Sequence, residues 1–193
     1  MGIIGRFKET QSVEMIPVVL HLNARLQPIH RGELFEDMLE QVLSQHNIGT
    51  ILGGGTLQMP SGEISSCDIE LNLRSDCTER FLSFLHRIDM IPKGSYITLG
   101  NKQFEIGNME GLALYLNGTD LSAEVYQNSD INELIDLLDN AMENSGKRMS
   151  YWEGSRETAL YYYGKSYNEM REKISLIIQT YPLCEKCRIE QIA

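Results

Sequence analysis

Long hydrophobic runs and basic residues are both scarce in this sequence. Its 193 residues contain 17 Lys and Arg against 27 Asp and Glu, which gives a formal net charge of -10. No window approaches the roughly 20 apolar residues that a membrane helix needs. The first residues also lack the apolar stretch and the small-residue cleavage site of a secretory signal. We therefore expect a soluble, cytoplasmic protein that has no membrane partner.

Basic patches are missing as well. The densest basic stretch is the pair Lys147-Arg148. Because a phosphate backbone repels an acidic protein that has no such patch, we expect no nucleic-acid partner. An acidic balance fits a basic protein partner, and it is equally common in cytosolic proteins that need only solubility.

The motifs that identify common enzyme classes are also absent. The sequence has no Gly-x-Ser-x-Gly, no His-Glu-x-x-His and no Gly-x-Gly-x-x-Gly. His30, His46 and His86 have no second metal ligand at a useful spacing. The sequence therefore nominates no nucleophile, no bound metal and no cofactor, and no motif assigns the chain to a family of known activity.

What the sequence does contain is periodicity. Between residues 16 and 106, alternating apolar residues predict strands, and apolar residues spaced by three and four predict helices. The strands are expected at 16–23, 49–59, 64–73 and 95–99, with a further run at 103–106. The helices are expected at 31–46 and 77–90, and Asp76 stands where it would cap the second helix. The order is β-α-β-β-α-β.

The second half of the sequence repeats this order. Strands are expected at 111–117, 148–152, 158–163 and 188–192, and helices at 129–143, capped by Ser129 or Asp130, and at 167–180. The predicted fold class is therefore α+β, a tandem repeat of two ferredoxin-like β-α-β-β-α-β units with antiparallel sheets and helices on one face. The units are assigned to 13–106 and 107–193. We expect them to pack closely, with their sheets either face to face or joined side by side.

Short sequence echoes support a duplication. The run Val19-Leu20-His21-Leu22-Asn23 resembles Ala113-Leu114-Tyr115-Leu116-Asn117. Each run leads into a loop and then an acidic helix. We expect Asn23 and Asn117 to occupy equivalent strand ends, where their side chains bond nearby backbone groups.

A candidate site follows from alternation on the first sheet. In a ferredoxin-like unit the first and third strands are neighbours, and one sheet face is left free of helices. Period-2 alternation places His21, Asn23, Asp68 and Glu70 on that free face. These side chains have the chemistry for a divalent metal or an acid–base pair. The alternative interpretation is a solvated polar face that carries a surface histidine.

Glycine and aromatic residues mark a second candidate region. Gly53, Gly54 and Gly55 either let the backbone approach a ligand closely or reflect a bulge or close strand contact. In the second half, Trp152, Tyr161 and Tyr163 either line a pocket for a flat ligand or pack in the core.

Four cysteines complete the candidates. Cys184 and Cys187 form a Cys-x-x-Cys that follows a predicted helix, which is not the strand-to-helix context of a redox motif. A structural zinc normally needs a second close pair, and Cys67 and Cys77 are ten residues apart, so the spacing disfavours a zinc site and leaves metal binding by Cys184 and Cys187 open. We expect reduced cysteines, as in a cytosolic protein.

Two functional hypotheses remain open. The first is a non-catalytic cytoplasmic binding or regulatory module, for example an acidic antagonist of a basic protein. Its basis is the acidic residues of the two predicted helices at 31–46 and 129–143. The second is a small-ligand sensor or metal-assisted enzyme whose site lies on the open sheet face around His21, Asp68 and Glu70.

Overall fold

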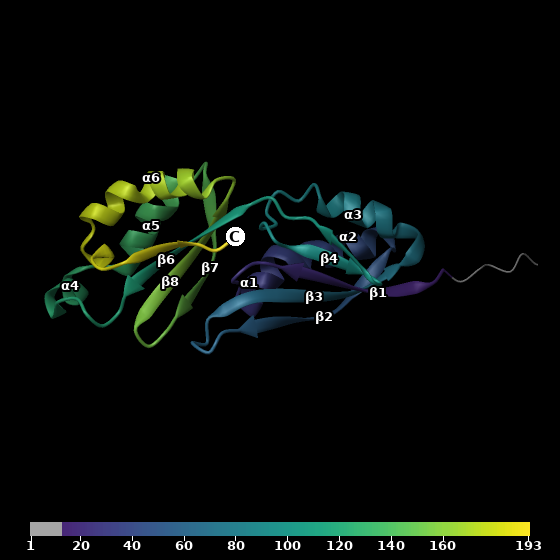
Figure 1. Ribbon diagram of the computed structural model, residues 1–193, viewed down its shortest axis with the longest axis horizontal. Helices are drawn as coiled ribbons and strands as arrows, with labels where there is room; N and C mark the ends of the chain where they lie inside the picture. Colours follow the sequence, from purple (N-terminus) through teal and green to yellow (C-terminus); the bar gives the residue numbers. More distant parts are fainter. Residues whose placement is uncertain (1–12) are drawn as a thin grey trace, which may run out of the picture.

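The computed structural model describes residues 13–193, and its first half is built on a five-stranded antiparallel sheet (Figure 1). The strand order is β2-β3-β1-β4-β5. The tight turn between β2 and β3 contains Pro60 and Gly62, and Gly62 adopts a φ of 85° that favours glycine. The strands are β1 (Met15–Leu22), β2 (Gly49–Gln58), β3 (Ile64–Arg74), β4 (Tyr96–Leu99) and β5 (Lys102–Glu105).

Two helical segments cover one face of this sheet. Their apolar stripes pack onto it, so that Phe35, Leu39 and Phe81 are almost completely buried. The second segment ends at Leu85 rather than at residue 90. The segments are α1 (Pro28–Arg31), a π-helical turn η1 (Gly32–Glu36) and α2 (Asp37–His46), and then a 3-10 turn η2 (Ser75–Cys77) and α3 (Thr78–Leu85).

The second half is built on a separate four-stranded antiparallel sheet. Its strand order is β7-β8-β6-β9, and α5 and α6 lie over one face (Figure 1). The strands are β6 (Glu110–Asn117), β7 (Gly146–Glu153), β8 (Glu157–Gly164) and β9 (Arg188–Gln191). The helices are α4 (Ala123–Asn128), α5 (Ile131–Met142) and α6 (Tyr167–Thr180), followed by a 3-10 turn η3 (Pro182–Cys184). The molecule is therefore an α+β protein with two antiparallel sheets.

The helix ends differ in part from expectation. Asp130 caps α5, because its side chain accepts a hydrogen bond from the Asn132 backbone N–H at 2.8 Å. The expected cap at Asp76 is wrong. The residue before α3 is Cys77, and the Asp76 carboxylate is instead paired with Arg74 at 2.7 Å. The short helix α4 was not expected, since its six residues give too little periodicity to recognise.

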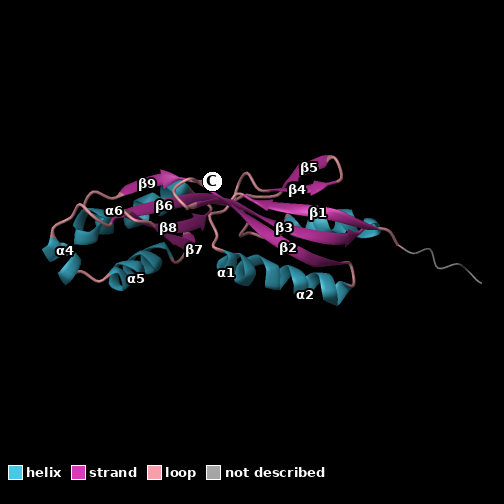
Figure 2. Cartoon of the chain, turned by 90° about the horizontal axis from the view of Figure 1, so that it is seen from below, coloured by secondary structure: helices cyan, strands magenta, loops and turns pink. Residues whose placement is uncertain are grey.

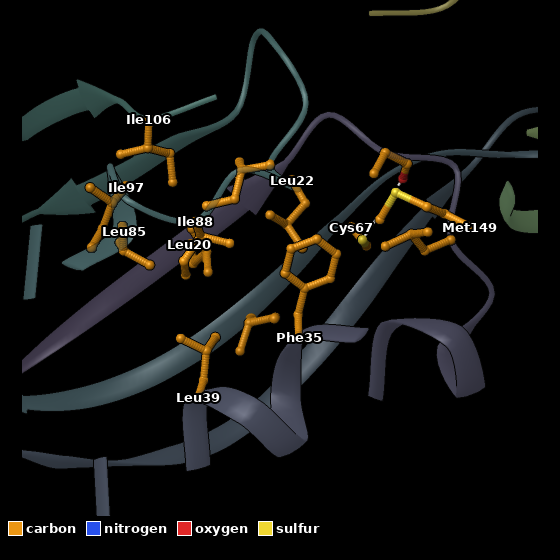
Figure 3. Close-up of a cluster of buried hydrophobic side chains, with 14 of the residues drawn as sticks. Leu20, Leu22, Phe35, Leu39, Cys67, Leu85, Ile88, Ile97, Ile106 and Met149 are labelled. Atoms are coloured by element: carbon orange, nitrogen blue, oxygen red, sulfur yellow. Dashed lines mark hydrogen bonds between the residues drawn. The ribbon is translucent and has the colours of Figure 1, made fainter. Parts of the chain in front are cut away.

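The hydrophobic core is divided into two clusters, and one of them crosses between the halves. The larger cluster contains residues of both sheets, including Leu20 and Phe35 from the first half and Met149 from the second (Figure 3). The smaller cluster lies between the second sheet and its helices, around Leu114 and Leu138. The division of the chain at 106–107 remains a prediction, because the larger cluster contains residues from both sides of it.

The two sheets lie beside each other along the long axis of the molecule (Figure 2). They are not joined into one continuous sheet, and the face-to-face arrangement is also not found. Instead, the segment after β1 and the turn before β3 reach across to the second sheet, as the hydrogen bonds of Arg25, Gln27 and Glu63 show. Within residues 13–193, no helix is both long and apolar enough to cross a membrane.

Candidate functional site

His21 and Asp68 lie opposite each other on the helix-free face of the first sheet. β1 and β3 are antiparallel neighbours, and their register pairs these two residues. His21 Nδ1 is 2.7 Å from Asp68 Oδ1, and the imidazole stacks on the Tyr96 ring with centroids 4.5 Å apart. The side chains remain 22% and 49% exposed, respectively. The imidazole is therefore held by the Asp68 carboxylate and the Tyr96 ring and remains partly open to solvent.

The other two residues expected beside this pair do not contact it. Glu70 lies opposite Val19, on the same face as Asp68, and its side chain is exposed to solvent. Asn23 follows the end of β1, where its side-chain amide donates to the Lys93 carbonyl oxygen at 2.7 Å. Asn23 therefore ends the strand, as expected for Asn at that position. Within residues 13–193, no group of three or more His, Cys, Asp or Glu side chains is arranged to hold a metal ion.

The glycine run in β2 makes room for a side chain of α1 and does not line a cleft. A Cβ atom on Gly54 would lie 2.9 Å from the Arg31 guanidinium and 2.8 Å from the Asp68 carbonyl oxygen. Arg31 is buried there, and it donates to the Gly55 carbonyl oxygen at 3.0 Å and to Glu36 at 2.6 Å. Gly53 and Gly55 face open space, with nothing within 4 Å of the position of a Cβ atom. The run therefore provides close packing under Arg31 and a flat surface on the other face.

The aromatic residues of the second half face the first half. Tyr161 and Tyr163 are 1% and 0% exposed, and both belong to the core cluster that crosses between the halves. Trp152 packs against the same cluster and is partly buried. Of the two interpretations that the sequence left open, the positions of Tyr161 and Tyr163 agree with packing in the core. Their sheet face is covered by the neighbouring half of the chain, so these tyrosines do not line an open pocket.

A buried polar cluster lies where the two halves meet, and sequence reasoning missed its central residues, Arg25 and Glu63. Glu63 Oε1 accepts hydrogen bonds from the hydroxyls of Tyr115 at 2.7 Å and Tyr161 at 2.6 Å. The Arg25 guanidinium donates to both Glu63 and Tyr115, and the Arg25 backbone N–H donates to the Tyr163 hydroxyl at 2.8 Å. We call these five residues the junction cluster.

Burial and the acidic partner act together on the phenols of this cluster. Burial raises the pKa of Tyr161, and the hydrogen bond to the Glu63 carboxylate raises it further. The same two causes raise the pKa of Tyr115. Both phenols therefore stay protonated and act as hydrogen-bond donors, which suits a structural cluster better than a proton-transfer site.

A second contact between the halves joins a serine and a histidine. His30 Nδ1 is 2.9 Å from Ser150 Oγ, which also accepts a hydrogen bond from the Gln27 backbone N–H at 3.1 Å. A Ser–His pair is the beginning of a nucleophilic site, which requires an accessible hydroxyl. Ser150 is only 2% exposed. The pair therefore attaches α1 to β7 and exposes no nucleophile.

The cysteines are all reduced among the described residues. Cys67 and Cys184 are buried, and Cys77 and Cys187 are partly buried. The thiol of Cys184 lies against Cys187, and its hydrogen bond holds the pKa of Cys187 below its usual range. Burial raises the pKa of Cys67 to about 12.

Comparison with known proteins adds little to this geometry. No protein-family model matches the chain, and no curated protein matches it. Similar solved structures include a proposed monooxygenase from Fusobacterium nucleatum, at 12% identity and a TM-score of 0.32 over 91% of each chain. An "unknown protein" from Galdieria sulphuraria is 10% identical, with a TM-score of 0.29, covering 93% of this chain and 98% of that one. The first two RRM domains of the yeast poly(U)-binding protein are 15% identical, with a TM-score of 0.24, covering 91% and 99%.

Proposed function

We propose that this protein is a non-catalytic, cytoplasmic binding module that engages a basic protein surface, for example as an antagonist of that protein. The observation that carries the proposal is a set of acidic side chains on α1–α2 and on α5 and its two ends that have no ion-pair partner among residues 13–193. These two helical segments lie one after the other on the same side of the molecule (Figure 2). Four free cysteines are consistent with a reducing compartment.

The acidic side chains form a solvent-facing stripe on each helix. Among residues 13–193, no Lys, Arg or His lies within ion-pair distance of seven of the nine carboxylates on these segments; Glu36 and Asp139 are the two that are paired. The seven are Glu33, Asp37, Glu40, Asp130, Glu133, Asp136 and Glu143. We call this set the acidic surface.

The spacing of the acidic surface is unfavourable for the free protein. Glu33 and Asp37 are four residues apart along one helical segment, and Glu133 and Asp136 are three apart on α5. Like charges at these spacings repel each other and weakly destabilise a helix. A basic partner relieves this repulsion and is attracted over a distance by the net charge of -10. Both effects support a role in recognition.

We further propose that the two halves are ferredoxin-like repeats derived from one ancestral unit. The support is that the first four strands of each half have the same order in their sheets, with the first strand between the third and the fourth, and that β5 is an additional edge strand of the first sheet. Asn23 follows β1, and Asn117 ends β6 and accepts hydrogen bonds from the backbone N–H groups of Thr119 and Asp120. The repeat places one acidic helix in each half.

Affinity capture with a charge-neutralised variant tests the proposed function. Tagged wild-type protein is incubated with lysate of its native host at low and high salt, and captured proteins are identified by mass spectrometry. We expect a basic protein that is retained at low salt and released at high salt, because salt screens exposed charges. The test variant removes four charges of the acidic surface through Glu33→Gln, Asp37→Asn, Asp136→Asn and Glu143→Gln.

A matched control removes the same number of charges elsewhere. Its substitutions are on exposed carboxylates outside the acidic surface, namely Asp89→Asn, Glu105→Gln, Glu172→Gln and Glu185→Gln. The proposal requires that the test variant loses the partner and the control keeps it. Equal loss of the partner by both variants would show that only the net charge of the protein matters and not the acidic surface. Capture of no partner at either salt concentration would refute the proposal.

A small-ligand site on the open sheet face is the second candidate function. The observation that favours it is the arrangement of His21 between Asp68 and Tyr96, which holds an imidazole in one orientation at the surface. Thermal-shift screening against metals, nucleotides and amino acids tests it. A ligand at 100 times its dissociation constant stabilises the protein by about 2.7 kcal/mol. The shift must disappear in His21→Ala, and a screen without any shift would remove this candidate.

A further inference from the structure

A small apolar pocket opens between α2 and α3, on the helix-covered side of the first sheet. Its volume is about 130 Å³. Apolar side chains from both helices and from the residue before β2 line it, namely Val42, Phe81, Phe84 and Ile48. The centroids of the two phenylalanine rings lie 6.1 Å apart with an angle of 32° between the ring planes, and Phe81 is the deeper of the two, being 1% exposed.

The polar part of the pocket lining is entirely basic. Of the residues that the structure describes, His46, Arg80 and Arg87 are the only polar ones that line it, and no carboxylate does. Among residues 13–193, no ion pair or side-chain hydrogen bond is made by Arg80 or Arg87, and both are exposed. The pocket therefore presents two guanidinium groups with no acidic partner among the described residues, within a chain whose net charge is -10.

This combination selects for a particular ligand chemistry. A guanidinium binds a carboxylate through two parallel hydrogen bonds, and it is less strongly hydrated than an ammonium. The apolar lining needs a hydrocarbon group to displace water from the phenylalanines. An engineered apolar cavity of about 150 Å³ accommodates benzene, so a pocket of this size holds one ring or a short chain.

We propose that this pocket binds a small organic carboxylate, with its ring or short hydrocarbon chain against Phe81 and Phe84 and its carboxylate on Arg80 and Arg87. We call it the α2–α3 pocket. This site is separate from the acidic surface and does not depend on the function proposed above. It adds a small-molecule ligand to a protein that otherwise presents negative charge.

Calorimetric titration of the full chain with benzoate and hexanoate tests the proposal. Two control ligands each keep one part of a probe. Benzyl alcohol keeps the ring of benzoate without the charge, and acetate keeps the charge of hexanoate without the longer hydrocarbon chain. We expect at least one of the two carboxylates to bind with a dissociation constant of about 10 mM or lower. Both control ligands are expected to bind at least about tenfold more weakly, since each loses either the contact with the arginines or the contact with the phenylalanines.

Substitutions at the pocket rim locate the binding. The double variant Arg80→Gln, Arg87→Gln removes exposed charges and leaves the apolar lining intact. It is expected to lose about tenfold or more in affinity. Arg171→Gln removes an exposed arginine of α6 and serves as the control, which keeps wild-type affinity. Circular dichroism establishes that all variants are folded.

Four outcomes would overturn the proposal. Absence of binding by both carboxylates excludes the ligand class. Equal binding of benzyl alcohol indicates an apolar cavity without anion selectivity, and equal binding of acetate indicates a general anion site. Unchanged affinity in the Arg80, Arg87 double variant places the carboxylate elsewhere on the protein.

Discussion

Glu63 is the residue on which the junction between the two halves depends most. Glu63 is 6% exposed, and its carboxylate accepts hydrogen bonds from the hydroxyls of Tyr115 and Tyr161 and from the guanidinium of Arg25. A buried carboxylate is costly to desolvate, and the cost is recovered only where hydrogen bonds and an opposite charge surround it. The junction cluster meets both conditions. Glu63 therefore fixes how the turn before β3 sits on the second sheet.

Replacing Glu63 by alanine is expected to destabilise the protein by about 3 kcal/mol, because two buried hydroxyls and a partly buried guanidinium lose their acceptor. Urea denaturation followed by circular dichroism and by fluorescence of Trp152 measures the change. The control is Glu70→Ala, an exposed carboxylate on the open sheet face, expected to change stability by less than about 0.5 kcal/mol. A cost for Glu63→Ala no greater than that of the control would show that the junction cluster contributes nothing to stability.

The candidate residues could be predicted from the sequence only where regular strands position them. Alternation placed His21 and Asp68 on one face, because both lie inside long, regular strands. Arg25 and Glu63 could not be found in this way, since one lies in a loop and the other in a turn, where no period applies. The available signal was indirect. Three consecutive tyrosines, Tyr161 to Tyr163, have hydroxyls that need buried partners once the strand is covered.

Cys187 is expected to be the most reactive thiol of the described residues at neutral pH. The thiolate is the reactive form, and the hydrogen bond from Cys184 lowers the pKa of Cys187, so more of its thiolate is present than at an ordinary cysteine. Partial burial and the neighbouring Asp76 raise the pKa of Cys77, which acts in the opposite direction. Iodoacetamide labelling at several pH values, read by mass spectrometry, gives the order of alkylation.

The control for this labelling is Cys184→Ala, which removes the hydrogen bond. The alkylation of Cys187 is then expected to slow and to require higher pH. Faster labelling of Cys77 than of Cys187 in the native wild-type protein would contradict the assignment.

At the scale of elements, β2 is the edge strand that needs the most protection. It is ten residues long and contains neither proline nor any charged residue, which are the usual means of keeping an edge from pairing with another chain. The helical segment before it supplies charged groups instead. Glu40 accepts a hydrogen bond from the Ile51 backbone N–H at 3.2 Å, and Arg31 donates to the Gly55 carbonyl oxygen at 3.0 Å. The glycines leave room for the Arg31 side chain.

A matched pair of glycine substitutions tests this packing. Gly54→Ala puts a methyl group within 3 Å of the Arg31 guanidinium and a backbone carbonyl oxygen, so we expect a loss of about 1–3 kcal/mol. Gly53→Ala adds the same methyl group in open space, and the expected change is below about 1 kcal/mol. Thermal and urea unfolding compare the two variants. Equal stabilities of the Gly54→Ala and Gly53→Ala variants would mean that the packing of Arg31 does not need the space left by the absent side chain at Gly54.

The elements themselves were largely predictable, and their boundaries were less so. Strong alternation and helical spacing indicated both sheets, because each strand buries one face and each long helix one stripe. The predicted end of α3 was wrong, because the helix ends at Leu85. Its predicted cap was also wrong, because Arg74 pairs with the Asp76 carboxylate that would otherwise cap the helix. Competition of this kind is tertiary, and local sequence does not record it.

At the scale of the whole molecule, an acidic surface and a basic, apolar pocket are parts of one connected structure. The acidic surface runs along α1–α2 and α5, and the basic, apolar α2–α3 pocket lies in the first half. A core cluster shared by both halves and the junction cluster connect the two sheets. Sequence could not predict how the sheets meet, because the first-half residues that bond to strands of the second sheet, Arg25, Gln27 and Glu63, lie outside regular elements. The central claim is that recognition uses both acidic helices together.

Hydrogen exchange of the complex tests that claim most directly. The basic partner obtained by affinity capture is purified and added to this protein, and amide exchange is followed by mass spectrometry with and without it. We predict slower exchange on binding in residues 28–46 and 131–142, the two helical segments of the acidic surface, and unchanged exchange in β1, β3 and α6. Protection confined to one of these helical segments, or located on the open face of the first sheet, would contradict the account.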